Sequence, residues 1–255
     1  MRLMKRILSA AAVLALSASL LIGCSSGTAS SVPVSASSAA VSSVEETASS
    51  AVDENEAAAA QLLNDLTGSY QELWPVILAD EYQQTWLDDC TALVGEDNAE
   101  AAFEKLSSMV TGDVYGEDAV EAYANGGGAY FCGFTNDLAT LTFDGETSTI
   151  SGTDKDGNVL FSHTYHYIGM EPVHGLYEFE SDDADSGEFT YFFLAPDTSA
   201  ETYHIEFRYG SDAEALSQYD AGEYAYWVAS GISTDCDQTM IDNCIELFCT
   251  ENLAG

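Results

Sequence analysis

Hydrophobic and polar positions follow two different periods along residues 57–255. Up to residue 124 the apolar residues recur at helical spacing, and this pattern returns at the end of the chain. Asp97 and Asn98 are typical of a helix cap, which places one helix start at Ala99. The expected helices cover residues 57–66, 71–94 with an interruption near Pro75, 99–110, 117–124 and 237–251.

From residue 129 onward, short segments rich in aromatic and β-branched residues alternate with turn residues. Asp144-Gly145 and Asp156-Gly157 are pairs that close tight hairpins. Successive strands with short links indicate an antiparallel meander, and closure into a barrel removes exposed edges. The sequence therefore predicts a mainly β fold with flanking helices. The expected strands cover residues 129–135, 138–143, 147–152, 159–168, 174–180, 189–194 and 202–209.

The first 23 residues have the parts of a secretory signal peptide: basic residues, an apolar run and small residues before the cleavage point. Cys24 follows Leu21-Ile22-Gly23, which is the bacterial lipoprotein pattern, in which the cysteine is lipidated and becomes the new N-terminus. The apolar run is too short, and its flanks are wrong, for a helix that spans a membrane. We expect an extracytoplasmic protein anchored to the cell membrane by a lipid on Cys24.

Two regions follow the signal peptide. Residues 24–56 are mostly Ser, Ala, Thr and Val, with a few acidic residues and no aromatic residue. Such a composition cannot bury enough surface to offset chain entropy, so it predicts a flexible tether. Residues 57–255 have the length of one domain and contain the aromatic residues that a packed core needs.

The charge balance excludes one class of partner. The formal net charge is −37, and only Lys105, Lys155 and Arg208 are basic beyond Cys24. Nucleic-acid binding needs a basic face, which this chain lacks. The same shortage excludes a polybasic contact with anionic lipid, so membrane attachment depends on the lipid at Cys24. The acidic surface is expected to concentrate cations, to serve solubility, or to do both.

Five cysteines lie in the predicted domain, in a compartment that permits disulfides. Their number is odd, so at least one thiol stays free or pairs between chains, and spacing leaves the connectivity open. The sequence has no Cys-x-x-Cys, which argues against a thioredoxin-like site or a zinc ribbon. The five are Cys90, Cys132, Cys236, Cys244 and Cys249.

A resemblance to a known family covers nearly the whole predicted domain. Residues 68–77, Gly-Ser-Tyr-Gln-Glu-Leu-Trp-Pro-Val-Ile, resemble the opening motif of the ZinT family of bacterial periplasmic zinc- and cadmium-binding proteins. The resemblance implies a lipocalin-like (calycin) antiparallel β-barrel with flanking helices. Further similar segments are Gly175 to Phe179, Asp183 to Phe189, Ala195-Pro196, Tyr203 to Phe207 and Ser211 to Leu216.

The resemblance also implies zinc binding at one mouth of the barrel, mainly through histidines. Two of the family's histidines form a His-x-His pair on a strand, and that pair corresponds here to Thr202 and His204. A further family histidine precedes an Ala-Pro, but the segment before Ala195-Pro196 contains none. The usual set of ligands is therefore reduced in this chain.

The residues that are present suggest a different set of metal ligands. Glu206 lies two residues after His204 on one expected strand, so both side chains share a face. His166 and His174 flank the turn at 169–172, and either one would complete a site for zinc, which accepts nitrogen and carboxylate ligands. The competing interpretation is a single hydrogen-bonded His204 inside the barrel.

Two functions remain open at this stage. The first is an extracytoplasmic, membrane-anchored lipoprotein that binds zinc and stores it or delivers it to a metal-uptake system. The alternative is a metal-free calycin module that binds a small apolar ligand or a partner protein, because such pockets are mostly apolar. No Ser-His-Asp or Cys-His arrangement stands out, so we expect that the protein is not an enzyme.

Overall fold

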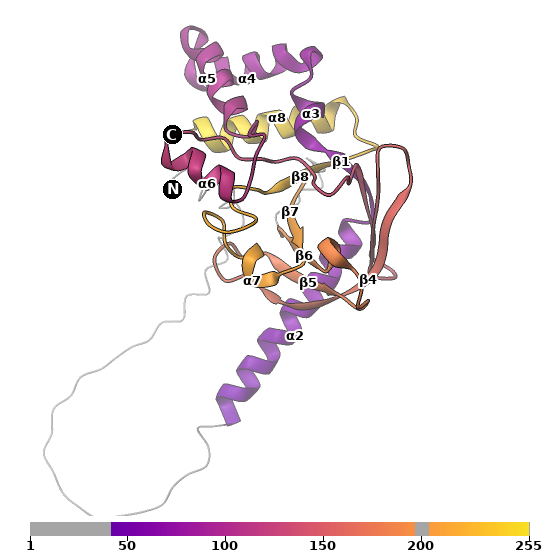
Figure 1. Ribbon diagram of the computed structural model, residues 1–255. Helices are drawn as coiled ribbons and strands as arrows, with labels where there is room; N and C mark the ends of the chain where they lie inside the picture. Colours follow the sequence, from indigo (N-terminus) through magenta and orange to yellow (C-terminus); the bar gives the residue numbers. More distant parts are fainter. Residues whose placement is uncertain (1–41, 197–203, 255) are drawn as a thin grey trace, which may run out of the picture.

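A closed barrel of eight antiparallel strands forms the body of the molecule (Figure 1). The structure is a computed structural model that describes residues 42–196 and 204–254, so the expected signal peptide and Cys24 lie outside the described residues. Each strand pairs with its sequence neighbours, and β1 pairs with β8. The strands are β1 Gly68–Glu72, β2 Thr140–Asp144, β3 Thr149–Thr153, β4 Val159–Met170, β5 Tyr177–Ser181, β6 Tyr191–Leu194, β7 His204–Gly210 and β8 Ala229–Ser233.

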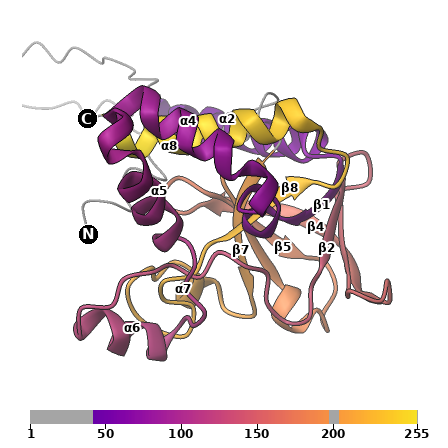
Figure 2. The same cartoon turned by 90° about the horizontal axis from the view of Figure 1, so that it is seen from above.

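The helices flank this barrel, which confirms the predicted fold class. Figures 1 and 2 show α4 and α8 side by side at one end of the molecule, with α3 and α5 next to them. Among the described residues no helix combines the length and the hydrophobicity that crossing a membrane requires. The helices are α2 Ser42–Asp65, α3 Leu73–Ile77, α4 Gln83–Val94, α5 Ala99–Ser108, α6 Glu117–Ala124, α7 Ala213–Leu216 and α8 Gln238–Leu253, with short 3₁₀ turns at Asp80–Tyr82, Glu96–Asn98 and Gly187–Phe189.

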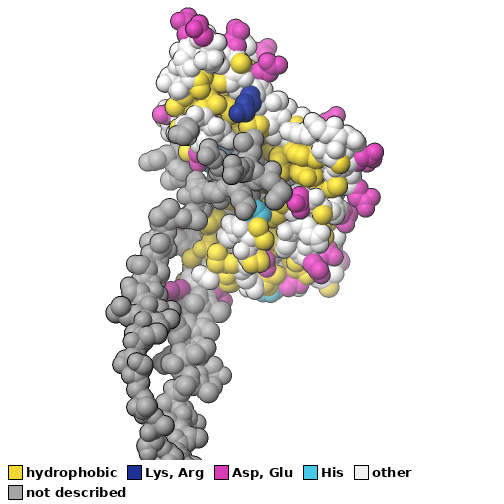
Figure 3. Space-filling view, turned by 90° about the vertical axis from the view of Figure 1, so that its left-hand side faces the viewer, with side chains coloured by type: hydrophobic (Ala, Val, Ile, Leu, Met, Phe, Trp, Pro, Cys, Tyr) yellow, Lys and Arg dark blue, Asp and Glu magenta, His cyan; other side chains and the backbone are white. Residues whose placement is uncertain are grey.

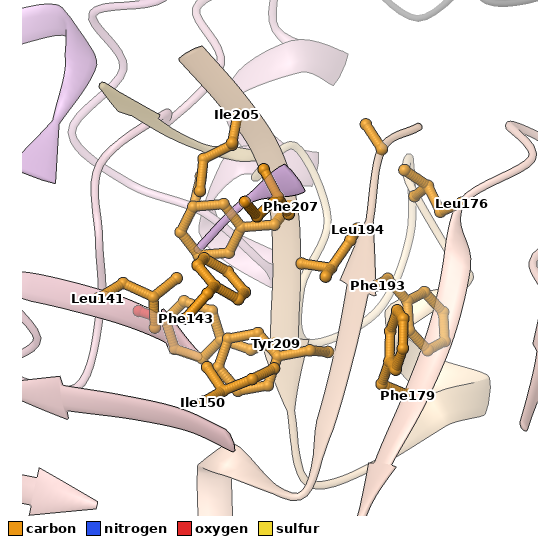
Figure 4. Packing of buried hydrophobic residues seen from close by; sticks show 14 of the residues in the cluster. Leu141, Phe143, Ile150, Leu176, Phe179, Phe193, Leu194, Ile205, Phe207 and Tyr209 are labelled. Atoms are coloured by element: carbon orange, nitrogen blue, oxygen red, sulfur yellow. The ribbon is translucent and has the colours of Figure 1, made fainter. Parts of the chain in front are cut away.

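Aromatic rings fill the interior of the barrel (Figure 4). Phe192 on β6 is fully buried, and its ring centroid lies 5.4 Å from those of Tyr165 and Tyr209. Tyr209 in turn meets the ring of Trp227 at 4.9 Å. An eight-stranded barrel has an interior that side chains can fill, and here they are large and in contact. This packing disfavours the alternative of a small apolar ligand inside the barrel.

A second core joins the helices to the barrel. Trp86 of α4 is fully buried, donates its indole N–H to the Ile77 carbonyl oxygen at 2.7 Å, and meets the Phe248 ring of α8 at 6.0 Å. Ile232 of β8 belongs to the same cluster, so the helical layer rests on the strand that closes the barrel. Burial of this apolar surface, more than helix propensity, holds the helices in place.

The structure differs from the sequence prediction in several places. The helix expected over residues 71–94 is divided, because residues 71 and 72 belong to β1 and the rest forms α3, a 3₁₀ turn and α4. Residues 129–135 form no strand, and Phe131 makes only isolated bridges; β1 and β8 complete the barrel instead. The helix α2 begins at Ser42, inside the range 24–56 that the composition predicted as a tether, because its alanines favour a helix. Asn98 makes no side-chain cap bond, and its amide donates back to the Val94 carbonyl oxygen at 3.0 Å.

Candidate functional site

The two faces of β7 point to opposite sides of the barrel wall. Ile205, Phe207 and Tyr209 belong to the barrel core. Because side chains alternate along a strand, His204 and Glu206 lie on the opposite, outer face. The interpretation that places His204 inside the barrel is therefore wrong. Thr202 lies outside the described residues.

A buried arginine holds a loop over this outer face. Arg208, next after Glu206 on the same side of β7, is 0% exposed. Its guanidinium donates to the carbonyl oxygens of Leu216 and Tyr224, and to that of Gln218 at 3.2 Å. Burial lowers the pKa of Arg208, as expected for a cation with little water around it. The residue therefore fixes the segment that follows α7 against the strand.

Tyr219, in that segment, is where several polar groups meet. The Arg208 guanidinium carbon lies 4.2 Å from the centroid of its ring, and the His174 ring centroid lies 3.7 Å away. Burial is the main reason that the pKa of Tyr219 is raised, and the charges of Glu171 and Glu206 add to the shift. His174, a predicted ligand, thus lies against Tyr219, and the charge of Glu206, a second predicted ligand, acts on the same tyrosine.

The turn between β4 and β5 positions His174. Glu171 in this turn is 0% exposed, and its carboxylate accepts hydrogen bonds from the backbone N–H groups of Val173 at 2.9 Å and His174 at 2.6 Å. The Nδ1 atom of His174 lies 3.4 Å from the same carboxylate. The imidazole is thereby placed between a buried carboxylate and the Tyr219 ring.

His166 lies apart from the other predicted ligands. It is on β4, and its Nδ1 atom lies 2.8 Å from a carboxylate oxygen of Asp182. In the barrel order, β5 and β6 separate β4 from β7, which corresponds to about 14 Å along the barrel surface. Outward-facing side chains on such distant strands do not converge on one ion.

The described residues offer donors for a metal ion, but not a complete set of ligands. Within residues 42–196 and 204–254, no three His, Cys, Asp or Glu side chains are grouped so that they could hold a metal ion. Structural zinc has four ligands, and open zinc sites keep three from the protein. The candidate site is therefore the pair His204 and Glu206, with His174 as the neighbouring donor.

The fold of this chain has counterparts among solved structures. No protein-family model and no curated protein matches this chain. In structure it is similar to the Zn(II)-bound ZinT-like domain of AdcA from Streptococcus pneumoniae, with a TM-score of 0.46, 16% identity, and coverage of 72% of this chain and 89% of that domain. The fold is similar to that of a ZinT-like domain. The sequence motifs resemble the same type of domain.

A second similar structure is Zn(II)-bound AdcA from Streptococcus pneumoniae, with a TM-score of 0.43 and 15% identity. The match covers 73% of this chain but only 35% of AdcA. The chain thus spans about a third of the length of that protein, and the likeness concerns its ZinT-like fold alone.

Sequence reasoning missed Glu171, Arg208 and Tyr219, which organise this side of the barrel. A signal was present for Arg208, because it is one of only three basic residues beyond Cys24 and lies in an aromatic strand. An isolated cation in such a strand is expected to be buried and to have fixed partners. Glu171 and Tyr219 lie in turns, where spacing gives no comparable signal.

The Glu171 carboxylate makes stability depend on pH. Burial raises the pKa of Glu171, but its hydrogen bonds with His174 and Val173 outweigh that effect and lower the pKa overall. A lowered pKa means that the ionised group stabilises the fold above the unfolded pKa of about 4.3, and that this contribution is lost as the pH falls. We expect Glu171→Gln to cost about 1–3 kcal/mol at neutral pH, measured by urea unfolding.

The difference between Glu171→Gln and the parent chain should shrink as the pH is lowered below about 4.3. Glu178 provides a control, because its pKa is shifted in the opposite direction. Burial and the nearby Glu171 raise the pKa of Glu178. Glu178→Gln should therefore not destabilise the protein at neutral pH. A difference for Glu171→Gln that stays constant from neutral to acid pH would contradict the assignment.

Proposed function

We propose that this chain binds a divalent metal ion, specifically zinc, at the outer face of β7. It does so as an extracytoplasmic lipoprotein anchored through Cys24, and it stores the ion or delivers it to a metal-uptake system. The observation that carries this proposal is the placement of His204 and Glu206 on one face of one strand. An imidazole nitrogen and a carboxylate oxygen at positions i and i+2 approach one ion from the same side. The role is binding and not catalysis.

In this proposal His174 becomes the third donor only after it moves, because no three such side chains of the described residues are grouped as ligands. Its ring lies against Tyr219, and the charge of Glu206 helps to raise the pKa of that tyrosine, which supports His174 as the neighbouring donor. To bind an ion, the His174 imidazole has to turn away from the Glu171 carboxylate. Water supplies the remaining ligand, as in zinc sites that keep an open position.

The charge of the protein supports a cation as ligand. Beyond Cys24, Arg208 is buried, so Lys105 and Lys155 are the basic residues that remain to offset the acidic surface. Figure 3 shows acidic side chains on both the helical and the barrel parts of one face. Such a field raises the local concentration of cations, but by itself it binds them loosely and at many places. The test must separate a defined site from this background.

The experiment is a calorimetric titration of Zn²⁺ into the purified, metal-stripped chain. We expect near one tightly bound ion per chain. His204→Ala and Glu206→Gln should each weaken the affinity by roughly tenfold or more. His166→Ala is the matched control, because it removes an imidazole that Asp182 engages on the distant strand β4. This variant should bind zinc like the parent chain.

Two results would contradict the proposal. Weak binding at many sites, equal in the parent chain and in His204→Ala, would mean that only surface carboxylates hold the metal. An equal loss in His166→Ala and His204→Ala would place the ion away from the outer face of β7.

A further inference from the structure

Two cysteines from distant parts of the chain meet in the helical layer. The Sγ atoms of Cys90 on α4 and Cys249 on α8 lie 4.0 Å apart, although the residues are separated by 159 positions in the sequence. Both residues are fully buried. The two sulfur atoms are thus already in van der Waals contact in the folded chain.

The packing around the pair keeps the two sulfur atoms together. Trp86 lies one turn before Cys90 on α4, and Phe248 directly precedes Cys249 on α8. Their rings meet edge to face at 6.0 Å, and α4 packs against α8 along this contact. The helix axes are therefore fixed at the level of the cysteines. An approach of the sulfurs by about 2 Å, to the bonded distance near 2.05 Å, asks only for a local adjustment.

We propose that Cys90 and Cys249 form a disulfide that joins α4 to α8 in the extracytoplasmic protein. The electrons go to a disulfide-bearing oxidant such as glutathione disulfide. One cysteine thiolate attacks the oxidant and releases its first thiol. The second cysteine thiolate then attacks the resulting mixed disulfide and releases the other thiol. The two cysteines lose two protons and two electrons, and the oxidant is reduced to two thiols.

The buried position decides when the bond forms. Burial is the main reason that the pKa values of the Cys90 and Cys249 thiols are raised, so neither is a thiolate at neutral pH in the folded state. Attack requires the thiolate and access to the oxidant. The bond therefore forms while the chain folds, before the two helices close over the sulfurs. Folded, reduced protein should resist the oxidant.

The other three cysteines have different surroundings from this pair. Cys132 belongs to the same core cluster but packs near Trp74, and burial strongly raises its pKa. Cys236 lies just before α8 and Cys244 lies within it, so the two are close in sequence and a link between them would constrain little of the chain. Cys90 and Cys249 close a long loop, for which a disulfide removes most entropy from the unfolded state.

The experiment refolds the full chain from denaturant with glutathione disulfide. Remaining thiols are alkylated, and a protease that cleaves after Asp and Glu releases peptides for mass spectrometry. We expect a linked peptide pair that contains Cys90 and Cys249. The melting temperature of the oxidised chain should exceed that of the same sample after reduction by roughly 5–15 °C.

Cysteine variants extend the test. The melting temperature of each variant is compared before and after reduction of the same sample, so a general loss of stability does not affect the result. Cys90→Ala and Cys249→Ala should lose the reducible shift in melting temperature, and the matched control Cys132→Ala should keep it. Alkylation of both Cys90 and Cys249 after oxidative refolding, or their linkage to other cysteines, would overturn the proposal. A Cys90–Cys249 link that leaves the melting temperature unchanged would overturn its stabilising role.

Discussion

Replacing Arg208 by alanine is expected to lower the free energy of unfolding by about 3–5 kcal/mol. The guanidinium is fully buried and donates to the carbonyl oxygens of Leu216, Gln218 and Tyr224. Alanine leaves these oxygens buried without a donor, which costs more than the bonds themselves contribute. It also removes the contact with the Tyr219 ring and leaves a cavity.

Two substitutions make this result interpretable. Arg208→Lys keeps the positive charge, but one ammonium group cannot reproduce the planar fork that serves several carbonyl oxygens, so we expect an intermediate loss. Lys105→Ala removes an exposed basic side chain on α5 and should change stability by less than about 0.5 kcal/mol. Urea unfolding followed by circular dichroism measures all three. Arg208→Ala and Lys105→Ala with equal stability would contradict a structural role for the guanidinium.

The sequence predicted the strands that have strong local signals. β2 through β7 are aromatic or β-branched segments, and Asp144-Gly145 and Asp156-Gly157 lie in tight turns between them. Asp237 caps α8, close to the expected helix start, by accepting a hydrogen bond from the Met240 backbone N–H at 3.0 Å. In each case the residues that determine the element lie within a few positions of it. The element can therefore be predicted without knowledge of the fold.

The two strands that close the barrel carry no such signal. β1 reads Gly-Ser-Tyr-Gln-Glu and runs into α3, so its apolar spacing merges with the helical pattern that follows. β8 reads Ala-Ser-Gly-Ile-Ser, with small residues that have low strand propensity. Both become strands because pairing with each other and with β2 and β7 satisfies their backbone groups. Tertiary pairing here overrides local preference.

Strand periodicity predicted only the part of the candidate site that lies on β7. Alternation places His204 and Glu206 on one face, but the partners of that face come from the turn with Glu171 and the segment with Tyr219. These contacts join parts of the chain far apart in sequence. The resemblance to a zinc-binding family gave no guide to them, because its histidine positions are mostly occupied by other residues here.

Replacing Phe192 by alanine should have an effect as large as the loss of Arg208, for a different reason. The ring is fully buried at the centre of the barrel, and it contacts the rings of Tyr165, Phe207 and Tyr209 at centroid distances of 5.4, 6.4 and 5.4 Å. Alanine removes this apolar surface and leaves a cavity that strands held in a closed ring cannot collapse to fill. We expect a loss of about 3–5 kcal/mol in urea unfolding.

The size of the side chain, and not aromatic character alone, should control this loss. Phe192→Leu keeps most of the volume and should cost about half as much or less, because the cavity is smaller. Val159→Ala at the exposed start of β4, where the residue is 70% exposed, should leave stability within about 0.5 kcal/mol of the parent chain. Because the ring points inward while His204 and Glu206 face outward on β7, zinc affinity of folded Phe192→Ala should be unchanged. A folded Phe192→Ala variant that is as stable as the parent chain would show that the barrel interior is not closely packed, and would make a ligand inside it the better explanation.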